Sequence, residues 1–206
     1  KEESSLMKKA IDISCAAHLE LMKSLQPGMH EYQAQSLLEF EFKNSGAEAP
    51  GYPSIVGGGQ NTCMLHYATN RQQLSAGQLL LIDAGAEYHG YSADITRTLP
   101  VNGKFSDEQK IIYNLVLQAQ EAGIKACKAG NRYLASHVAA VKIIQAGLLQ
   151  LGIIKNESDY RKYFMHGTSH YLGLDVHDVG RSGNLKPGNV ITVEPGIYIP
   201  EGSDCD

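Results

Sequence analysis

The sequence predicts an α+β protein built from two similar halves, each with two helices followed by antiparallel strands. Three observations support this prediction. Apolar residues at helical spacing occur twice in each half, a β-hairpin pattern occupies residues 79–99, and Leu74–Gly85 aligns with Leu185–Gly196 at a constant offset of 111 residues. Such halves would join their sheets about a pseudo-twofold axis and place their helices on one outer face.

The first half, about residues 1–101, begins with two predicted helices. Apolar spacing places the first up to about Lys23 and the second over about Glu31–Asn44. Prolines and glycines then exclude helix, and a short strand precedes the glycines 57–59, which we expect to form a flexible loop. A further strand is expected over Cys63–Tyr67 before the hairpin.

The second half, about residues 102–206, repeats this order, and both halves form one domain. Ser106 is a helix-capping residue, and apolar spacing carries that helix to about Gly130. Another helix is predicted over about Leu134–Leu151. Strands are expected near Tyr163–Met165 and within the aliphatic run 190–199.

Composition argues against several functional classes. The net charge is −4 with a pI of about 6.1, so no basic surface indicates a nucleic-acid partner. No apolar run approaches the roughly 20 residues that span a bilayer, so we expect no membrane association. The four cysteines show neither a CxxC pair nor disulfide-framework spacing. Reduced thiols of this kind predict a cytoplasmic protein.

The hairpin carries two aspartates that would share one face of the sheet. With a turn centred between Tyr88 and His89, Asp83 and Asp94 lie directly opposite each other, with Cβ atoms about 5 Å apart. Carboxylates this close repel, so one must be protonated or both must face a cation. Asp is also depleted in strands, which makes a chance pairing harder to accept.

The repeat connects this pair to the second half. The offset of 111 residues carries Asp83 onto Glu194 and His66 onto His177. Each half therefore presents an imidazole, a turn, and an aliphatic strand that ends in a carboxylate before glycine. The symmetry axis would bring the two carboxylate-bearing strands together.

A histidine cluster supplies nitrogen donors. His166, His170 and His177 fall within twelve residues, beside glycines that let a backbone approach a ligand. Three carboxylates with one of these imidazoles suit Mn²⁺, Co²⁺, Fe²⁺ or Zn²⁺, and the ligand set does not choose among them. Because three carboxylates exceed the need of one divalent ion, we expect two ions about 3.5–4 Å apart.

Three long motifs resemble one enzyme family. IDAGAEYHGYSADITRTLPVNGKFS, HGTSHYLGLDVHDVG and TVEPGIYI together resemble the pita-bread metallopeptidases, and within them aminopeptidase P, the Xaa-Pro aminopeptidases. The likeness covers essentially all 206 residues, including LHYATN around His66. It implies the pita-bread fold, and hydrolysis that removes the N-terminal residue of peptides with proline at the second position.

The resemblance also implies a ligand set for two divalent ions. Asp83 would bind one ion, Asp94 would bridge both, and His170 would be the imidazole ligand. Glu194 would be a ligand that also acts as general base on the bridging water. We expect Mn²⁺, with Co²⁺, Zn²⁺ or Fe²⁺ as alternatives.

The same resemblance implies three histidines in the substrate site. His66 and His177 would line the pocket, with His177 stabilising the tetrahedral intermediate. His166 would lie beside the proline end of the peptide. Peptide substrates with proline second are therefore the expected partners.

Two features depart from the family pattern. The family has a fifth ligand, a Glu on the return strand of the second hairpin, and we expect that strand to lie beyond Asp206, with Asp204 or Asp206 as a less favoured substitute. The amino-terminal domain that usually precedes this region, closes the site and builds the oligomer is also absent. The chain is therefore expected to be an inactive fragment of a protein that is a homo-oligomer when intact.

Other readings stay open. Prolidase, an Xaa-Pro dipeptidase with the same ligands, and methionine aminopeptidase share the fold. A non-catalytic pita-bread binding module is a further alternative, although such modules typically lose the ligands. Carboxylates paired with Arg97 or Lys186 would leave the histidine cluster unexplained and would bury ion pairs that rarely stabilise.

Overall fold

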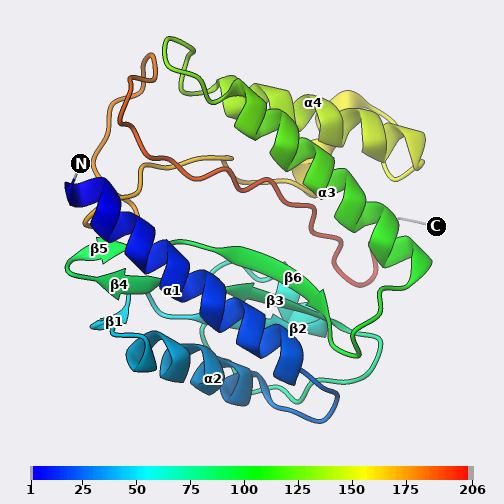
Figure 1. The fold of residues 1–206 in the computed structure, drawn as a ribbon. Helices are drawn as coiled ribbons and strands as arrows, with labels where there is room; N and C mark the ends of the chain where they lie inside the picture. The colour runs from blue at the N-terminus through cyan, green and yellow to red at the C-terminus, as the bar shows by residue number, and fades with distance from the viewer. Residues whose placement is uncertain (1, 204–206) are drawn as a thin grey trace. The chain divides into compact units, whose positions relative to one another are not determined.

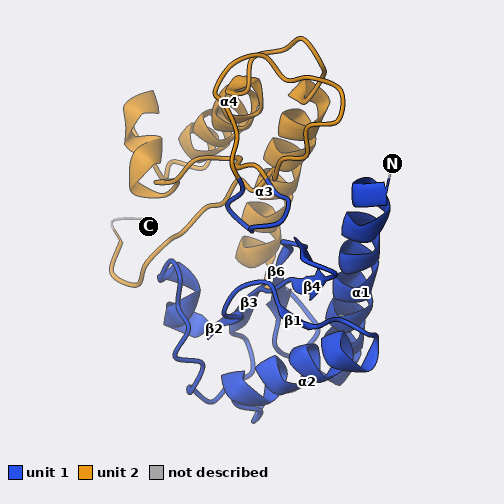
Figure 2. Ribbon diagram, turned by 90° about the vertical axis from the view of Figure 1, so that its left-hand side faces the viewer, with its two compact units in different colours: residues 1–105, 172–178 blue, residues 106–171, 179–206 orange. Residues whose placement is uncertain are grey.

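The computed structural model describes residues 2–203, which form two compact units. Figure 2 colours them separately. Unit 1 comprises residues 1–105 and 172–178, and unit 2 comprises residues 106–171 and 179–206. The short segment 172–178 therefore leaves the histidine-rich stretch of the second half and packs with the first.

Unit 1 begins with two helices that pack on each other and on the strands (Figure 1). Helix α1 spans Glu2–Ser24 and α2 spans Glu31–Asn44, and the prediction for α2 is confirmed to the residue. Each buries residues three or four positions apart, as an amphipathic helix does. The core they share includes Leu21, Leu38 and Phe42, none more than 1% exposed.

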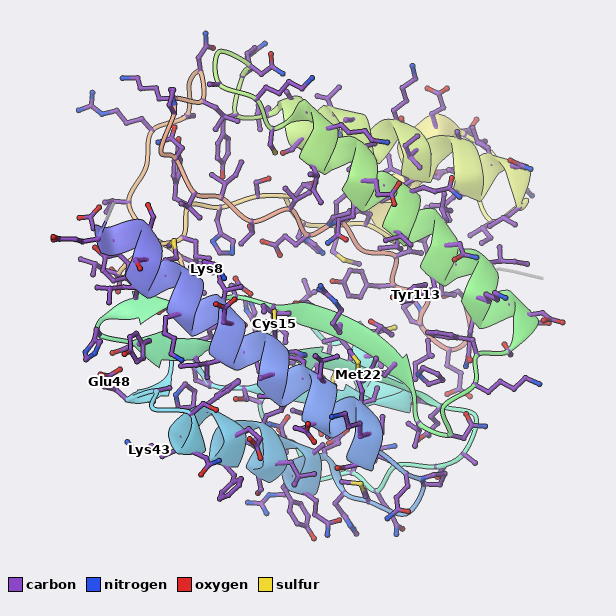
Figure 3. The ribbon with its side chains drawn as sticks, viewed as in Figure 1. Lys8, Cys15, Met22, Lys43, Glu48 and Tyr113 are labelled. Carbon is purple, nitrogen blue, oxygen red and sulfur yellow. The ribbon has the colours of Figure 1, made fainter. Side chains whose placement is uncertain are left out.

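The outer face of α1 carries a different set of side chains. Lys8, Cys15 and Met22 are spaced seven residues apart and lie along the exposed side of the helix (Figure 3). Because seven residues make nearly two helical turns, all three share one face. The buried residues of α1 lie on its other side, which faces the sheet.

The strands of unit 1 form two three-stranded antiparallel sheets. One contains β1 (Ala49–Pro50), β4 (Ala86–Tyr88) and β5 (Tyr91–Ser92) in the order β1-β4-β5. The other contains β2 (Ile55–Gly58), β3 (Leu79–Asp83) and β6 (Thr96–Pro100) in the order β2-β3-β6. The central strand β3 is thus paired on both edges.

Two expectations about the segment before β3 are wrong. Two of the glycines 57–59 belong to strand β2 instead of a loop, and a 3₁₀ helix over Gly59–Cys63 follows. Residues 63–67 form no strand, because the chain turns at His66, whose φ is 55°. Gly57 is needed here, since a Cβ would press against the backbone carbonyl of Asn61.

Unit 2 is built on two packed helices. Helix α3 spans Asp107–Ala126, and Ser106 caps it by accepting a hydrogen bond from the Gln109 N–H, as predicted. Helix α4 spans Ala135–Gln150 and packs against α3. A 3₁₀ helix over Glu157–Lys162 completes the regular elements described in this unit.

The expected strands of unit 2 appear only as extended, paired segments. The Thr192 and Glu194 N–H groups donate to the carbonyls of His170 and Thr168, and the Tyr198 N–H donates to Tyr163. These bonds run antiparallel, yet within residues 2–203 neither 163–165 nor 190–199 forms a regular strand. No helix among the described residues is long and apolar enough to cross a membrane.

Candidate active site

The turn of the hairpin sets the positions of the first two predicted ligands. Tyr88 pairs with Tyr91, so the turn consists of His89 and Gly90. Both have positive φ, 48° and 85°, as in a two-residue type I′ turn. The turn is therefore centred one residue later along the chain than the sequence predicted.

This shift changes the residue that pairs with Asp83, but Asp83 and Asp94 still lie on the same face of the hairpin. Asp83 pairs with Thr96, so the prediction that it lies directly opposite Asp94 is wrong. A shift of two residues in partner preserves the side-chain face, because side chains alternate with a period of two. Asp94 is therefore a diagonal neighbour of Asp83 on the same side of the hairpin.

Gly85 allows the two strands to approach at this point. The Ala84 N–H donates to Ile95 and the Ala93 N–H donates to Ala86, so the register continues through Gly85. A Cβ at Gly85 would overlap the carbonyl carbon and oxygen of Ala93. Only glycine fits opposite the peptide bond that leads into Asp94.

Tyr52 joins the two aspartates. Its hydroxyl oxygen lies 2.5 Å from Oδ1 of Asp83 and 3.0 Å from Oδ1 of Asp94. Burial, followed by the charges of both aspartates, raises the pKa of Tyr52 well above 10.0. The phenol therefore stays protonated and donates to the carboxylates, although its one proton can serve only one of them at a time.

Tyr52 is not among the residues that the sequence indicated as functional. Its position follows from the chain around it: β1 pairs with β4, and the Gly51 N–H donates to the Gly85 carbonyl. The available signal was a tyrosine between Pro50 and Pro53, in the stretch whose prolines and glycines exclude helix.

In unit 2, His170 and Glu194 come together. His170 Nε2 lies 3.1 Å from Oε1 of Glu194. His170 Nδ1 lies 2.9 Å from the Tyr171 carbonyl, which can only accept, so Nδ1 carries the proton. In the neutral ring, protonation of Nδ1 leaves a lone pair on Nε2. This is the tautomer that could bind a metal ion through Nε2.

Thr192 connects this pair and was also missed. Its hydroxyl donates to Oε1 of Glu194 at 2.8 Å and accepts from the His170 N–H at 2.9 Å. The repeat could have pointed to Thr192, because position 192 corresponds to Leu81 in the first half. A polar residue replaces an aliphatic one two positions before the carboxylate, hence on the same face.

The remaining predicted histidines lie in different surroundings. His166 Nε2 is 2.9 Å from the Tyr198 hydroxyl, and it lines a cavity of about 390 Å³. His66 and His177 are exposed, and both belong to unit 1. The cavity beside His166 is lined by His137, Tyr160, Arg161, Phe164, Met165, His166 and Gly167.

The four predicted metal ligands divide equally between the units. Asp83 and Asp94 belong to unit 1, and His170 and Glu194 belong to unit 2. Within the described part of either unit, no three His, Cys, Asp or Glu side chains gather as a metal site would require. The alternative ligands Asp204 and Asp206 lie outside the described residues.

Each pair nevertheless fits a divalent cation. Asp83 and Asp94 place two carboxylates against one hydroxyl oxygen, and a cation would neutralise their negative charge. The second pair offers a carboxylate oxygen and an imidazole nitrogen whose tautomer suits ligation. Oxygen donors with one nitrogen are the ligands that Mn²⁺, Zn²⁺, Co²⁺ and Fe²⁺ accept.

Comparison with known proteins identifies the family. The sequence profile of metallopeptidase family M24 matches residues 5–205. Xaa-Pro aminopeptidase of Escherichia coli (strain K12) is 46% identical over 210 residues, which cover 96% of this chain and 48% of that protein. The chain thus spans about half the length of this relative.

Solved structures agree with this match. A single-residue variant of Escherichia coli aminopeptidase P in complex with substrate has a TM-score of 0.97 and 43% identity, covering 100% of this chain and 49% of its own. Zinc-substituted Escherichia coli aminopeptidase P in complex with product also has a TM-score of 0.97, with 44% identity, 99% of this chain and 49% of its own.

The predicted α+β pita-bread fold is therefore confirmed. The match extends through the helices, the hairpin and the histidine-rich segment alike, since it leaves out only the first four residues and the last one. The chain belongs to metallopeptidase family M24.

Proposed function

We propose that the full-length protein is a dinuclear metal-dependent aminopeptidase that removes the N-terminal residue from peptides with proline at the second position. One observation carries the proposal: Asp83 and Asp94 both reach the hydroxyl oxygen of Tyr52, and so form a paired-carboxylate site on one hairpin face. The proposal is supported by the 46% identity to a protein named Xaa-Pro aminopeptidase.

The proposal assigns four residues to the metal ions. Asp83 would bind one ion, Asp94 would be a ligand of both, and His170 and Glu194 would complete the ligands that this chain supplies. When bound, two divalent ions provide Lewis acidity and a hydroxide nucleophile at neutral pH. Mn²⁺ is the proposed metal, and the existence of a zinc-substituted relative makes Zn²⁺ the first alternative to test.

Side chains of this chain then accept the proton and stabilise the developing charge. Glu194 accepts the proton that the attacking water releases, a general-base role typical of a carboxylate. His177 donates a hydrogen bond to the carbonyl oxygen as negative charge develops there. His66 and His166 line the substrate site, with His166 beside the proline end.

A bond to proline poses a particular recognition problem. Proline has a fixed φ and no N–H, and it restricts the residue before it to extended conformations. The cavity beside His166 is bordered by the aromatic rings of Tyr160 and Phe164, which could accommodate an apolar pyrrolidine ring. We assign the proline side chain to this cavity.

The proposal includes the setting of the enzyme. Cys15, Cys63 and Cys127 are free thiols, which supports a cytoplasmic location. We also propose a homo-oligomer for the full-length protein, to be measured by light scattering.

The test uses the full-length protein, stripped with a chelator and reloaded with Mn²⁺ or Zn²⁺. The substrates are a tripeptide with proline second, the same tripeptide with alanine second, and a dipeptide ending in proline. We expect metal-dependent release of the first residue from the proline tripeptide, with little cleavage of the alanine control.

The other outcomes are equally informative. Preferential cleavage of the dipeptide would replace the proposal with a prolidase-type dipeptidase. Cleavage of the alanine tripeptide at a similar rate would remove the proline specificity. Bound metal with no cleavage of any substrate would leave a binding module.

A further inference from the structure

A buried carboxylate outside the metal site organises the segment that carries His66. Glu31 is 0% exposed, and its side chain accepts four hydrogen bonds. Its Oε1 accepts from the Gly58 N–H at 2.7 Å and Asn61 Nδ2 at 2.9 Å. Its Oε2 accepts from the Tyr67 hydroxyl at 2.8 Å and the Gln72 N–H at 2.9 Å.

These four donors come from both ends of one segment. One oxygen of Glu31 binds the beginning of residues 58–72, and the other binds the end. Glu31 is also the first residue of α2, where the helix dipole stabilises a negative charge. Burying a carboxylate is costly unless its lone pairs are used, so this fourfold arrangement fixes the segment strongly.

Further bonds close the same segment against α2. The Glu31 N–H donates to the Gln72 carbonyl at 2.9 Å. Asn70, only 1% exposed, donates to the Gln35 side chain and the Ser54 carbonyl, and accepts from the Val56 N–H. The base of the segment is therefore rigid and its ends are held together.

The tip of the segment is different in character. Met64 and Leu65 are 50% and 48% exposed, and His66 is exposed beside them. His66 adopts a φ of 55°, an uncommon conformation for a residue other than glycine. Such backbone strain persists only where the surrounding structure imposes it. Tyr67, which donates to Glu31, is the next residue.

We propose that Glu31 is a positioning residue that holds His66 in the place where it meets the peptide substrate. The inference rests on the proposed function, because that function assigns His66 to the substrate site. Glu31 does not touch the substrate. It acts by tying both ends of the segment to α2 and thereby fixing the backbone at His66.

The test is Glu31→Gln in the metal-loaded full-length protein. Glutamine keeps the size of the side chain but replaces one acceptor oxygen with a donor NH₂. That NH₂ would face either the Gly58 and Asn61 donors or the Gln72 N–H, so at least one donor is left unpaired. The matched control is Glu20→Gln, the same change at an exposed residue of α1 that pairs with Lys23.

Two readouts are needed. Hydrogen exchange in residues 58–72 is expected to rise at least about tenfold in Glu31→Gln, because a hydrogen bond to a charged group contributes that much to local opening. The kcat/KM for the proline tripeptide is expected to fall about 10- to 100-fold, since displacing a substrate-contacting group by about 1 Å has an effect of that size. Glu20→Gln should change neither.

A double-mutant cycle separates positioning from a general structural effect. If Glu31 acts through His66, then Glu31→Gln changes kcat/KM less than about twofold once His66→Ala is present. An undiminished effect in that background overturns the proposal, and so does unchanged exchange in residues 58–72. Should Glu31→Gln fail to fold, Tyr67→Phe removes a single donor from the same carboxylate and must show the same non-additivity.

Failure of the proposed function gives a different result. A protein without activity on any proline peptide loses the kinetic readout in the parent itself. The exchange of residues 58–72 then still reports whether Glu31 fixes the segment, but the role in substrate positioning is overturned. A faster exchange with unchanged kcat/KM in an active enzyme overturns the positioning role alone.

Discussion

Removing the Tyr52 hydroxyl gives the sharpest test of the paired-carboxylate site. Tyr52→Phe keeps the ring and deletes a hydroxyl that lies within hydrogen-bonding distance of both Asp83 and Asp94, at 2.5 and 3.0 Å. A hydrogen bond to a charged acceptor contributes about 1.5–3 kcal/mol. We expect the metal-free variant to lose about that much unfolding free energy near neutral pH.

The second expected effect is on metal binding. Residues that orient metal ligands typically change affinity by about 10- to 100-fold when they are replaced. Without the phenol, the two carboxylates lose the hydroxyl that both approach. Orienting them then reduces the net binding free energy of the cation. We therefore expect the affinity for Mn²⁺ to fall within that range.

The assay is a chelator-competition titration with Mn²⁺, together with urea unfolding of the metal-free protein. The control is Tyr32→Phe, a tyrosine that is 38% exposed and whose ring, retained in phenylalanine, stacks on His30. An unchanged Mn²⁺ affinity in Tyr52→Phe would show that the hydroxyl does not orient the ligands. An equal loss of stability in the Tyr32 control would refute the magnitude worked out for Tyr52.

Three further predictions concern other parts of the two units. Gly85→Ala should destabilise unit 1 by about 1–3 kcal/mol or more, because the new methyl group overlaps the backbone of the neighbouring strand; an unfolding midpoint like that of Gly183→Ala, a glycine with open space around it and no positive φ, would contradict this. His18 is 3% exposed, and burial lowers its pKa below 6.5, so the folded chain binds no proton where the unfolded chain does. The unfolding free energy should therefore decrease as the pH falls through 6.5, and His18→Gln should flatten that slope in urea unfolding; an unaltered slope would assign it to other groups. Thr192→Val should lower Mn²⁺ affinity about 10-fold by freeing Glu194 to rotate, and an affinity equal to that of the parent would show that the hydroxyl only joins backbone segments.

Local patterns predicted the helices well. The bounds of α2 agree with the prediction at both ends, and Ser106 caps α3 as expected. Helix formation depends on residues three and four positions apart and on a capping side chain, so a short stretch of sequence contains the necessary information. The repeat at 111 residues likewise required only the sequence.

The strands were harder to predict, for a physical reason. Register depends on the conformation of the turn, and the positive φ angles at His89 and Gly90 moved the partner of Asp83 by two residues. Residues 63–67 have strand composition but turn instead, because Glu31 binds both ends of the segment around them. Composition shows which residues suit a strand, but a strand forms only where a partner strand, often distant in sequence, pairs with it.

The sequence alone determined the two-half architecture, the helices and the residue types of the candidate site. Periodicity and capping depend on residues close together in the chain, and a repeat is found by comparing the sequence with itself. Only the tertiary structure decided that Tyr52 meets Asp83 and Asp94, which are 31 and 42 residues away, and that Thr192 links His170 to Glu194. Such contacts form because the folded chain brings remote donors and acceptors together in buried places where each must find a partner. No spacing rule along the sequence encodes that requirement.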